Sequence, residues 1–192
     1  MTIEKSENSQ GKNTTAQEKS AVSTGVLSSK LRELLIAQLA HELRNHNLYL
    51  SFSNFYADKG LNLLSEYYKL RAKEEYTHHE WIRQYLNDNE IVYKYPAIDE
   101  IDETFETLLD PFKLTVEVEE ITTDMIYDIA DQATKENDHI TIAWLYGKDP
   151  SRGMLVLEQL EEQSLSKAAL DIAKLDDGWL IKEKAIMSLY NS

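Results

Sequence analysis

Glutamate residues stand on the apolar stripes of three predicted helices, and this pattern constrains the fold more than any other feature of the chain. A three- and four-residue spacing of apolar side chains predicts helices over residues 29–58, 62–89 and 105–137. The inward stripes of these helices carry Glu42, Glu75 and Glu119. A buried ionised carboxylate without a partner costs several kcal/mol, so the folded chain must either protonate these groups or hold them with cations.

The rest of the helical pattern sets the order of the elements. A fourth helical region covers 139–146 and 154–175, with a break over 147–153, and a short last helix follows Gly178. Residues 90–104 lack a helical period and form a long connection. A short turn, a long connection and a second short turn predict an all-α four-helix bundle. Its crossover joins helices two and three, which therefore run parallel, and a short fifth C-terminal helix caps one end.

The first part of the chain differs in composition from the rest. Residues 1–27 are rich in Ser, Thr, Gln, Asn and Lys and contain no aromatic residue. A segment of this kind cannot bury enough apolar surface to fold, so we expect a disordered polar tail. The bundle domain is then expected to occupy residues 28–192.

Composition and charge exclude several classes of protein. The chain has no Cys, which excludes disulfides, zinc-thiolate sites and iron–sulfur clusters. A formal net charge of -14 disfavours nucleic acid as a ligand and favours cations. No apolar run approaches the roughly 18 residues of a membrane span, and the chain starts without an apolar signal core. We therefore expect a soluble cytoplasmic protein that binds neither nucleic acid nor membrane.

The three stripe glutamates are predicted to lie at the same depth in the bundle. Glu42 lies 13 residues after the first helix starts, and Glu75 lies 13 residues after the start of the second. Glu119 lies nine residues after Asp110, where the regular third helix is expected to begin because Pro111 fits only a first turn. At ~1.5 Å per residue, all three glutamates reach mid-bundle.

A histidine strengthens the case for a metal. His78 follows Glu75 by three residues, so the two side chains share one helix face and can bind one ion together. A lone stripe glutamate is usually a boundary residue whose carboxylate reaches water. Three at matching depth beside a Glu-x-x-His motif instead favour a metal centre. Oxygen ligands with one imidazole suit iron or manganese, and zinc less well.

Other polar residues lie near these stripes, and their roles are either undecided or structural. Tyr49, seven residues after Glu42, could bond to a ligand carboxylate, donate electrons or pack in the core. Arg71 is expected only at the edge of the second stripe. His79 is expected to face outward or sideways, and His41 is expected at the surface. His46 lies close to the Glu42 stripe and is read as a packed histidine rather than a supporting one.

A second Glu-x-x-His motif, Glu136 to His139, cannot belong to the same centre. It lies 17 residues beyond Glu119, which corresponds to ~25 Å along a helix. We interpret it as a pair at a helix end.

At these residues the chain resembles the ferritins, specifically the haem-free bacterial type, over about residues 28–190. The resemblance assigns a first iron to Glu42, Glu75 and His78. It assigns a second iron to Glu75, Glu119 and Glu162, with Gln159 beside it. It assigns an adjacent third iron to Glu74, Glu158 and Glu161. It also implies that the helix after Gly178 lies at the fourfold axis of a cage of 24 chains.

Two related families fit less well, and the chain departs from the ferritin pattern in two places: the tail over 1–27, expected on the cage exterior, and the break over 147–153. Bacterioferritins have a haem-binding Met on the second helix, where this chain has none, and a second Glu-x-x-His on the fourth. DNA-coating mini-ferritins lack the fifth helix and build their site between subunits. The break over 147–153 places Glu158 about seven residues later than the family pattern, or two helical turns. This leaves the choice between Glu161 and Glu162 open.

The function that the resemblance implies is iron storage with ferroxidase activity. Fe²⁺ would be oxidised by O₂ or H₂O₂ at a di-iron centre within each subunit, without haem, and stored as ferric mineral in the cage. Glu42, Glu75, His78, Glu119 and Tyr49 would act in oxidation. The alternatives are a non-catalytic cage subunit, a soluble di-metal oxidase or peroxidase of the same bundle class, and, more remotely, a helical interaction module.

Overall fold

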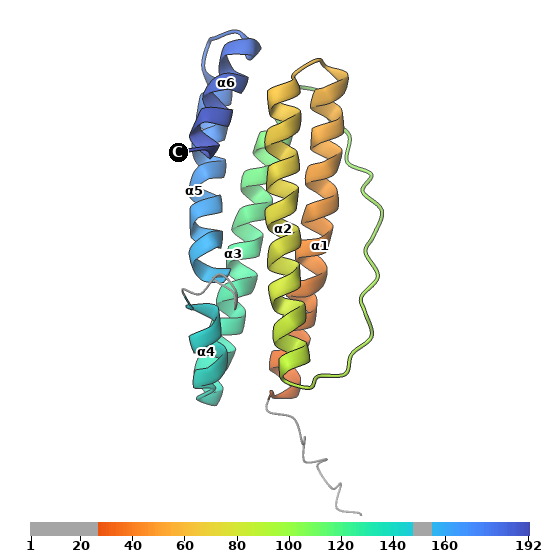
Figure 1. Ribbon diagram of the computed structural model, residues 1–192, viewed down its shortest axis with the longest axis vertical. Coiled ribbons are helices and arrows are strands. Elements are labelled where there is room, and N and C mark those ends of the chain that lie inside the picture. The colour runs from red at the N-terminus through yellow and green to blue at the C-terminus, as the bar shows by residue number, and fades with distance from the viewer. Residues whose placement is uncertain (1–26, 148–154) are drawn as a thin grey trace, which may run out of the picture.

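The computed structural model describes residues 27–147 and 155–192, and these residues form helices and loops without a strand. The helices are α1 (Ser29–Asp58), α2 (Asn62–Asp88), α3 (Asp110–Glu136), α4 (His139–Leu145), α5 (Leu155–Lys174) and α6 (Trp179–Tyr190). Three long columns are α1, α2 and α3, and α4 and α5 follow one another along the fourth (Figure 1). The predicted all-α four-helix bundle with a crossover and a short last helix is confirmed.

Local chemistry explains where the helices begin and end. Ser28 caps α1, because its hydroxyl accepts a hydrogen bond from the backbone N–H of Leu31. Pro111 stands in the first turn of α3, so this helix starts at Asp110 and not at residue 105. Asn137 ends α3 in the left-handed conformation, at a φ of 57°. Asp138 then caps α4 by accepting from two backbone N–H groups.

The crossover between α2 and α3 runs along the length of the bundle beside α1 (Figure 1). Glu103 from this segment pairs with Arg44 on α1. Tyr95, farther back along the segment, hydrogen-bonds through its hydroxyl to the ring of His79 on α2. These contacts fix the long connection to both helices of the first pair.

Two apolar clusters fill the bundle, and a layer of polar side chains separates them. The first cluster includes Leu39, Ile82, Ile126 and Val156. The second includes the aromatic residues Tyr49, Phe52, Tyr56, Tyr68 and Phe112. The buried residues between the clusters, called the polar layer below, are Glu42, Asn45, Arg71, Glu75, His78, Glu119, Thr122, Gln159, Glu162 and Ser166. Every column of the bundle contributes at least one of them.

The last helix begins at one end of the bundle and then runs back beside α5 (Figure 1). Trp179 at its start stacks on Phe112, the third residue of α3. Tyr190 at its end reaches Glu74 on α2, where its hydroxyl donates to Glu74 Oε1 at 2.6 Å. The predicted cap therefore extends along the bundle toward the polar layer.

Two predictions fall mainly on residues outside the described ranges. The tail over 1–27 is one, although Leu27 is described and is buried in the first apolar cluster. The break over 147–153 is the other. The domain limits therefore stay a prediction. Across 27–147 and 155–192, every helix is too short or too polar to span a membrane.

Candidate metal centre

The polar layer gathers four fully or almost fully buried carboxyl groups in the middle of the bundle. Glu42 comes from α1, Glu75 from α2, Glu119 from α3 and Glu162 from α5, and none is more than 4% exposed. Glu42, Glu75 and Glu119 lie at the same depth in the bundle, as expected from their spacing, and therefore lie close together. His78 lies one turn after Glu75 and is also buried.

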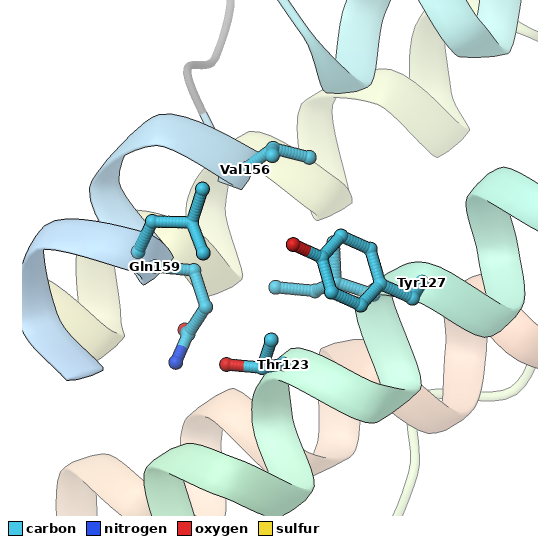
Figure 2. Close-up of a pocket in the computed structure, with 6 residues that line it drawn as sticks. Thr123, Tyr127, Val156 and Gln159 are labelled. Carbon is cyan, nitrogen blue, oxygen red and sulfur yellow. The ribbon is translucent and has the colours of Figure 1, made fainter.

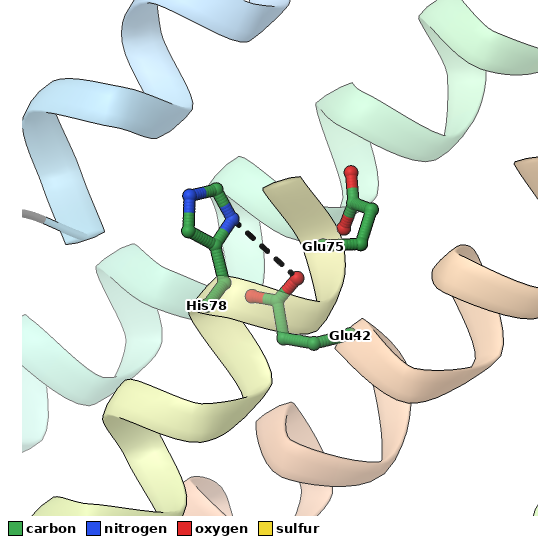
Figure 3. Close-up of side chains that lie close together, drawn as sticks. All are labelled: Glu42, Glu75 and His78. Atoms are coloured by element: carbon green, nitrogen blue, oxygen red, sulfur yellow. Dashed lines mark ion pairs between the residues drawn. The ribbon is translucent and has the colours of Figure 1, made fainter. Parts of the chain in front are cut away.

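The first half of the centre consists of Glu42, Glu75 and His78. Each offers a ligand atom within 4.8 Å of the others. Nδ1 of His78 lies 3.9 Å from Glu42 Oε2, the pair that the dashed line marks in Figure 3, and Glu75 lies beside this pair. Glu42 Oε2, Glu75 Oε1 and His78 Nδ1 have no hydrogen-bond partner within the protein. Buried polar atoms are normally paired, so three unpaired acceptor-type atoms facing one space fit a bound cation.

Electrostatics show what this half requires. Burial raises the pKa of Glu42 to about 7, and it raises the pKa of Glu75 well above its usual range together with repulsion from Glu119 and Glu162. Burial and the nearby charge of Arg71 lower the pKa of His78 to about 3, so its ring is neutral at pH 7. A metal ion would bind the neutral imidazole and displace protons from the carboxyl pair.

The second half consists of Glu75, Glu119 and Glu162, which also offer ligand atoms within 4.8 Å of one another. Here the acceptors of Glu119 already have donors. Tyr49 OH and Arg71 Nη2 both donate to Glu119 Oε1 at 2.6 Å. Gln159 Nε2 donates to Glu119 Oε2 at 2.7 Å. The two halves thus share Glu75 but differ in how their oxygens are satisfied.

Arg71 is buried in the centre, and the expectation that it lies at the edge of the second stripe is wrong. Its side chain is fully buried, and Nη2 also lies 3.5 Å from Glu162 Oε2. The sequence does contain a signal for this inward position, because a residue four positions before Glu75 lies on the same helix face. A long side chain on that face reaches the carboxylates of α3 and α5.

The residues assigned to a third iron are not brought together in the same way. Glu74 is partly buried, and its two oxygens accept from Arg71 Nη1 at 2.9 Å and from Tyr190 OH at 2.6 Å. Glu161 is exposed. Glu158 is partly buried and joins His78 and Glu162 in a further candidate group. The third iron site stays a prediction.

The break before α5 does not move the ligand face of this helix away from the centre. Gln159 and Glu162 are buried in the polar layer, whereas Glu161 points outward. Of these two glutamates, Glu162 is therefore the one that lies within the polar layer. Both assignments as ligands remain predictions.

Supporting residues that the sequence analysis did not single out lie behind the ligands. Gln38 Nε2 donates to Glu42 Oε1 at 2.7 Å. Asn45 Nδ2 lies 3.5 Å from Glu75 Oε2 and 3.2 Å from Thr122 Oγ1. Helical spacing could predict Gln38 and Asn45, because they lie four residues before Glu42 and three residues after it, on the same helix face.

Three of the other histidines have structural partners. Of the two directions predicted for His79, outward is wrong, because the residue is buried. The sideways direction agrees with its bond to α1, in which Nδ1 donates to the Leu39 carbonyl at 2.9 Å. His41 is half-buried rather than superficial and contacts Thr122. His46 donates to the Ala72 carbonyl at 2.7 Å, as a packed histidine does. Glu136 and His139 are both exposed at the α3–α4 junction.

A small pocket lies beside the centre, between α3 and α5 (Figure 2). It is lined by Thr123, Ile126, Tyr127, Val156, Gln159 and Leu160. Gln159 links it to the centre through its bond to Glu119. The pocket is too narrow to hold a water molecule, so it is not an open channel to the ligands.

Comparisons with known proteins agree with this arrangement. The family model for the ferritin-like domain matches residues 32–147. A bacterial non-heme ferritin of Staphylococcus saprophyticus is 27% identical over 146 residues, which cover 76% of this chain and 83% of that protein. One from Campylobacter jejuni is 28% identical over 150 residues, which cover 78% and 86%.

A solved structure shares the fold. The open pore ferritin of Archaeoglobus fulgidus superposes with a TM-score of 0.75 at 23% identity, over 84% of this chain and 96% of that chain. At this identity the likeness concerns the arrangement of the helices.

Proposed function

The chain belongs to the ferritin family, and from this premise we propose that it stores iron and oxidises Fe²⁺ at the metal centre of its own bundle. The observation that carries the proposal is the set of unpaired ligand atoms on Glu42, Glu75 and His78, which lie close together in the buried polar layer. An ion of the right charge and size would satisfy all three at once. The centre uses no haem, in keeping with the absence of Met from α2.

The residues divide the work as follows. Glu42, Glu75 and His78 bind one Fe²⁺, and Glu75 is shared with a second ion that Glu119 and Glu162 bind. The two Fe²⁺ would give up one electron each and become Fe³⁺; these two electrons, with two protons from solvent, would reduce O₂ to H₂O₂ or H₂O₂ to two molecules of water. The carboxylates stabilise the added positive charge, because oxygen ligands in a dry site act on charge more strongly than water does. Tyr49 and Gln159 hold Glu119 in the orientation that this role requires.

Storage requires that subunits assemble around the product. We propose that copies of this chain form a hollow cage, of 24 subunits by family resemblance, and that ferric mineral collects inside it in the cytoplasm. The formal charge of -14 per chain would concentrate Fe²⁺ near the cage walls. The third iron position at Glu74, Glu158 and Glu161 remains part of this proposal.

Aerobic titration with Fe²⁺, followed by absorption of the ferric product, tests the activity. We expect rapid oxidation by the wild type and its loss in Glu75→Ala and His78→Ala. His139→Ala is the matched control, because it alters an exposed Glu-x-x-His motif. Equal rates in all four proteins would overturn the assignment of the centre.

Size-exclusion chromatography after iron loading tests storage separately. A cage-sized particle that holds many Fe³⁺ per chain supports the proposal. A cage without rapid oxidation would identify a storage subunit with a weak site. A small oligomer that oxidises only stoichiometric iron would identify a di-metal oxidase.

A further inference from the structure

The guanidinium of Arg71 lies among the ligands of the candidate second metal. Nη2 donates to Glu119 Oε1 at 2.6 Å and lies 3.5 Å from Glu162 Oε2 and 3.4 Å from Ser166 Oγ. Nη1 donates to Glu74 Oε2 at 2.9 Å. The side chain is fully buried. This arginine is therefore built into the centre by contacts with three carboxylates.

A metal ion and this guanidinium would compete for the same oxygens. Arginine remains protonated in proteins, and its planar donors match carboxylate geometry. An ion held by Glu75, Glu119 and Glu162 needs one oxygen from each. Arg71 already contacts two of these three residues, and Tyr49 shares its oxygen on Glu119.

The first half of the centre has no such competitor among the described residues. Glu42 accepts a hydrogen bond from the neutral amide of Gln38, Glu75 accepts one from the neutral amide of Asn45, and the two carboxyl groups lie against each other. The three candidate ligand atoms of this half are unpaired.

In the second half Glu162 Oε1 is also unpaired, but both oxygens of Glu119 accept hydrogen bonds and Arg71 contacts Glu119 and Glu162. The centre is thus asymmetric, because a cationic side chain lies against the second half and against neither Glu42 nor His78 of the first.

We infer that Arg71 is a positioning residue that occupies the second metal position in the metal-free protein and forces two ions to bind in order. The first ion binds to Glu42, Glu75 and His78. The second binds only after the guanidinium leaves Glu119 and Glu162. The inference rests on the proposed function, since it concerns the metals of the same centre.

An alternative position for the Arg71 guanidinium lies beside Glu74. Nη1 already bonds to Glu74, which lies at the partly exposed side of the centre rather than within it. Rotation of the side chain toward Glu74 would keep one ion pair and release the two buried carboxylates. Only this displaced state can bind the second ion. The apparent affinity for that ion is therefore reduced by the fraction of molecules in which Arg71 is displaced.

Anaerobic titration with Co²⁺, by calorimetry and visible absorption, tests the inference without any oxidation step. The wild type is expected to bind one ion tightly and a second at least about tenfold more weakly. Arg71→Gln is expected to bring the two affinities together. The matched control is Arg83→Gln on the same helix, which removes only a partly exposed pair with Glu80 and should leave the wild-type pattern.

Two outcomes separate this inference from the proposed function. Two ions of equal affinity in the wild type, unchanged in Arg71→Gln, would overturn the ordering and leave the metal centre standing. Absence of Co²⁺ binding in both proteins would overturn both.

The wild type alone provides an independent check should Arg71→Gln fail to fold. Crystals grown with one equivalent of Co²⁺ should show anomalous density only at Glu42, Glu75 and His78, with Arg71 on Glu119. Excess Co²⁺ should add a second peak and move the guanidinium away. A second ion bound while Arg71 still contacts Glu119 would refute the inference.

Discussion

The hydroxyl of Tyr49 on α1 donates a hydrogen bond of 2.6 Å to Glu119 Oε1 on α3, across the middle of the bundle. Both residues are fully buried. Burial and the charges of Glu119 and Glu75 raise the pKa of Tyr49 well above its usual value, so the phenol keeps its proton and remains a donor. Of the roles open from sequence, bonding to a candidate ligand is the one this contact supports.

Tyr49→Phe should slow iron oxidation and lower stability by about 1.5–3 kcal/mol, because a buried hydrogen bond to a charged acceptor is lost. Arg71 and Gln159 still hold Glu119, so we expect the fold to survive. Stopped-flow oxidation and urea unfolding measure the two effects. Tyr68→Phe is the control, since its hydroxyl bonds to Thr115 and not to a candidate ligand. Equal oxidation rates in both variants would contradict a role for Tyr49.

Gln38→Leu should weaken binding of the first Co²⁺ by about 10–100-fold, the usual effect of removing a residue that orients a ligand. The amide donates to Glu42 Oε1 and so directs the other oxygen toward His78. Calorimetry without O₂ measures the affinity. Gln84→Leu is a matched control with the same four-residue spacing to a carboxylate, Asp88, at an exposed position. An unchanged affinity in Gln38→Leu would show that Glu42 needs no such support.

Removal of metal should destabilise the wild type and should not affect Glu75→Gln. An ion that binds only the folded state adds about 2.7 kcal/mol at 100 times its dissociation constant. Thermal unfolding with EDTA and with excess Co²⁺ measures this difference. In the metal-free state Glu75→Gln should be at least as stable as the wild type, because it removes one of four crowded buried carboxyl groups. A large Co²⁺-induced shift in Glu75→Gln would place the metal elsewhere.

The periodicity of the chain could predict much of this centre, and the reasons for its failures are physical. Glu42, Glu75 and Glu119 were found because rise per residue converts sequence spacing into depth. The sequence places Arg71 wrongly at the edge of the stripe, because helical spacing fixes only the position of the Cβ atom. The rotamers of a long side chain then decide which neighbours its end group reaches. The bond between His79 and the crossover depends on a loop without a period, so no spacing rule could predict it. The return of α6 to Glu74 likewise depends on tertiary packing.

The free energy of unfolding of the metal-free protein should fall as pH rises from about 4.5 to about 7, because the buried Glu42 carboxyl group ionises less readily in the folded state. Burial raises the pKa of this group from 4.5 to about 7 in the folded state. Between these values the unfolded chain has released the proton that the folded chain retains, so the folded state becomes less favoured as pH rises. Urea unfolding with EDTA across this range, compared with Glu42→Gln, isolates the effect from that of the buried histidines. The control Glu33→Gln, at an exposed site on α1, should follow the wild type. Parallel curves for the wild type and Glu42→Gln would contradict the raised pKa.

Tyr95→Phe should loosen the crossover without disturbing the metal centre. The hydroxyl of Tyr95 bonds to Nε2 of His79, whose Nδ1 in turn donates to the Leu39 carbonyl on α1. Burial lowers the pKa of His79, so the neutral ring can accept from the phenol on one side while it donates on the other. We expect a loss of about 1 kcal/mol and faster hydrogen exchange or proteolysis within residues 90–104. Tyr93→Phe is the control, because its ring stacks on Tyr95 and removal of its hydroxyl leaves the His79 bond intact. Faster cleavage in both variants alike would mean that ring packing, and not the bond to His79, holds the crossover.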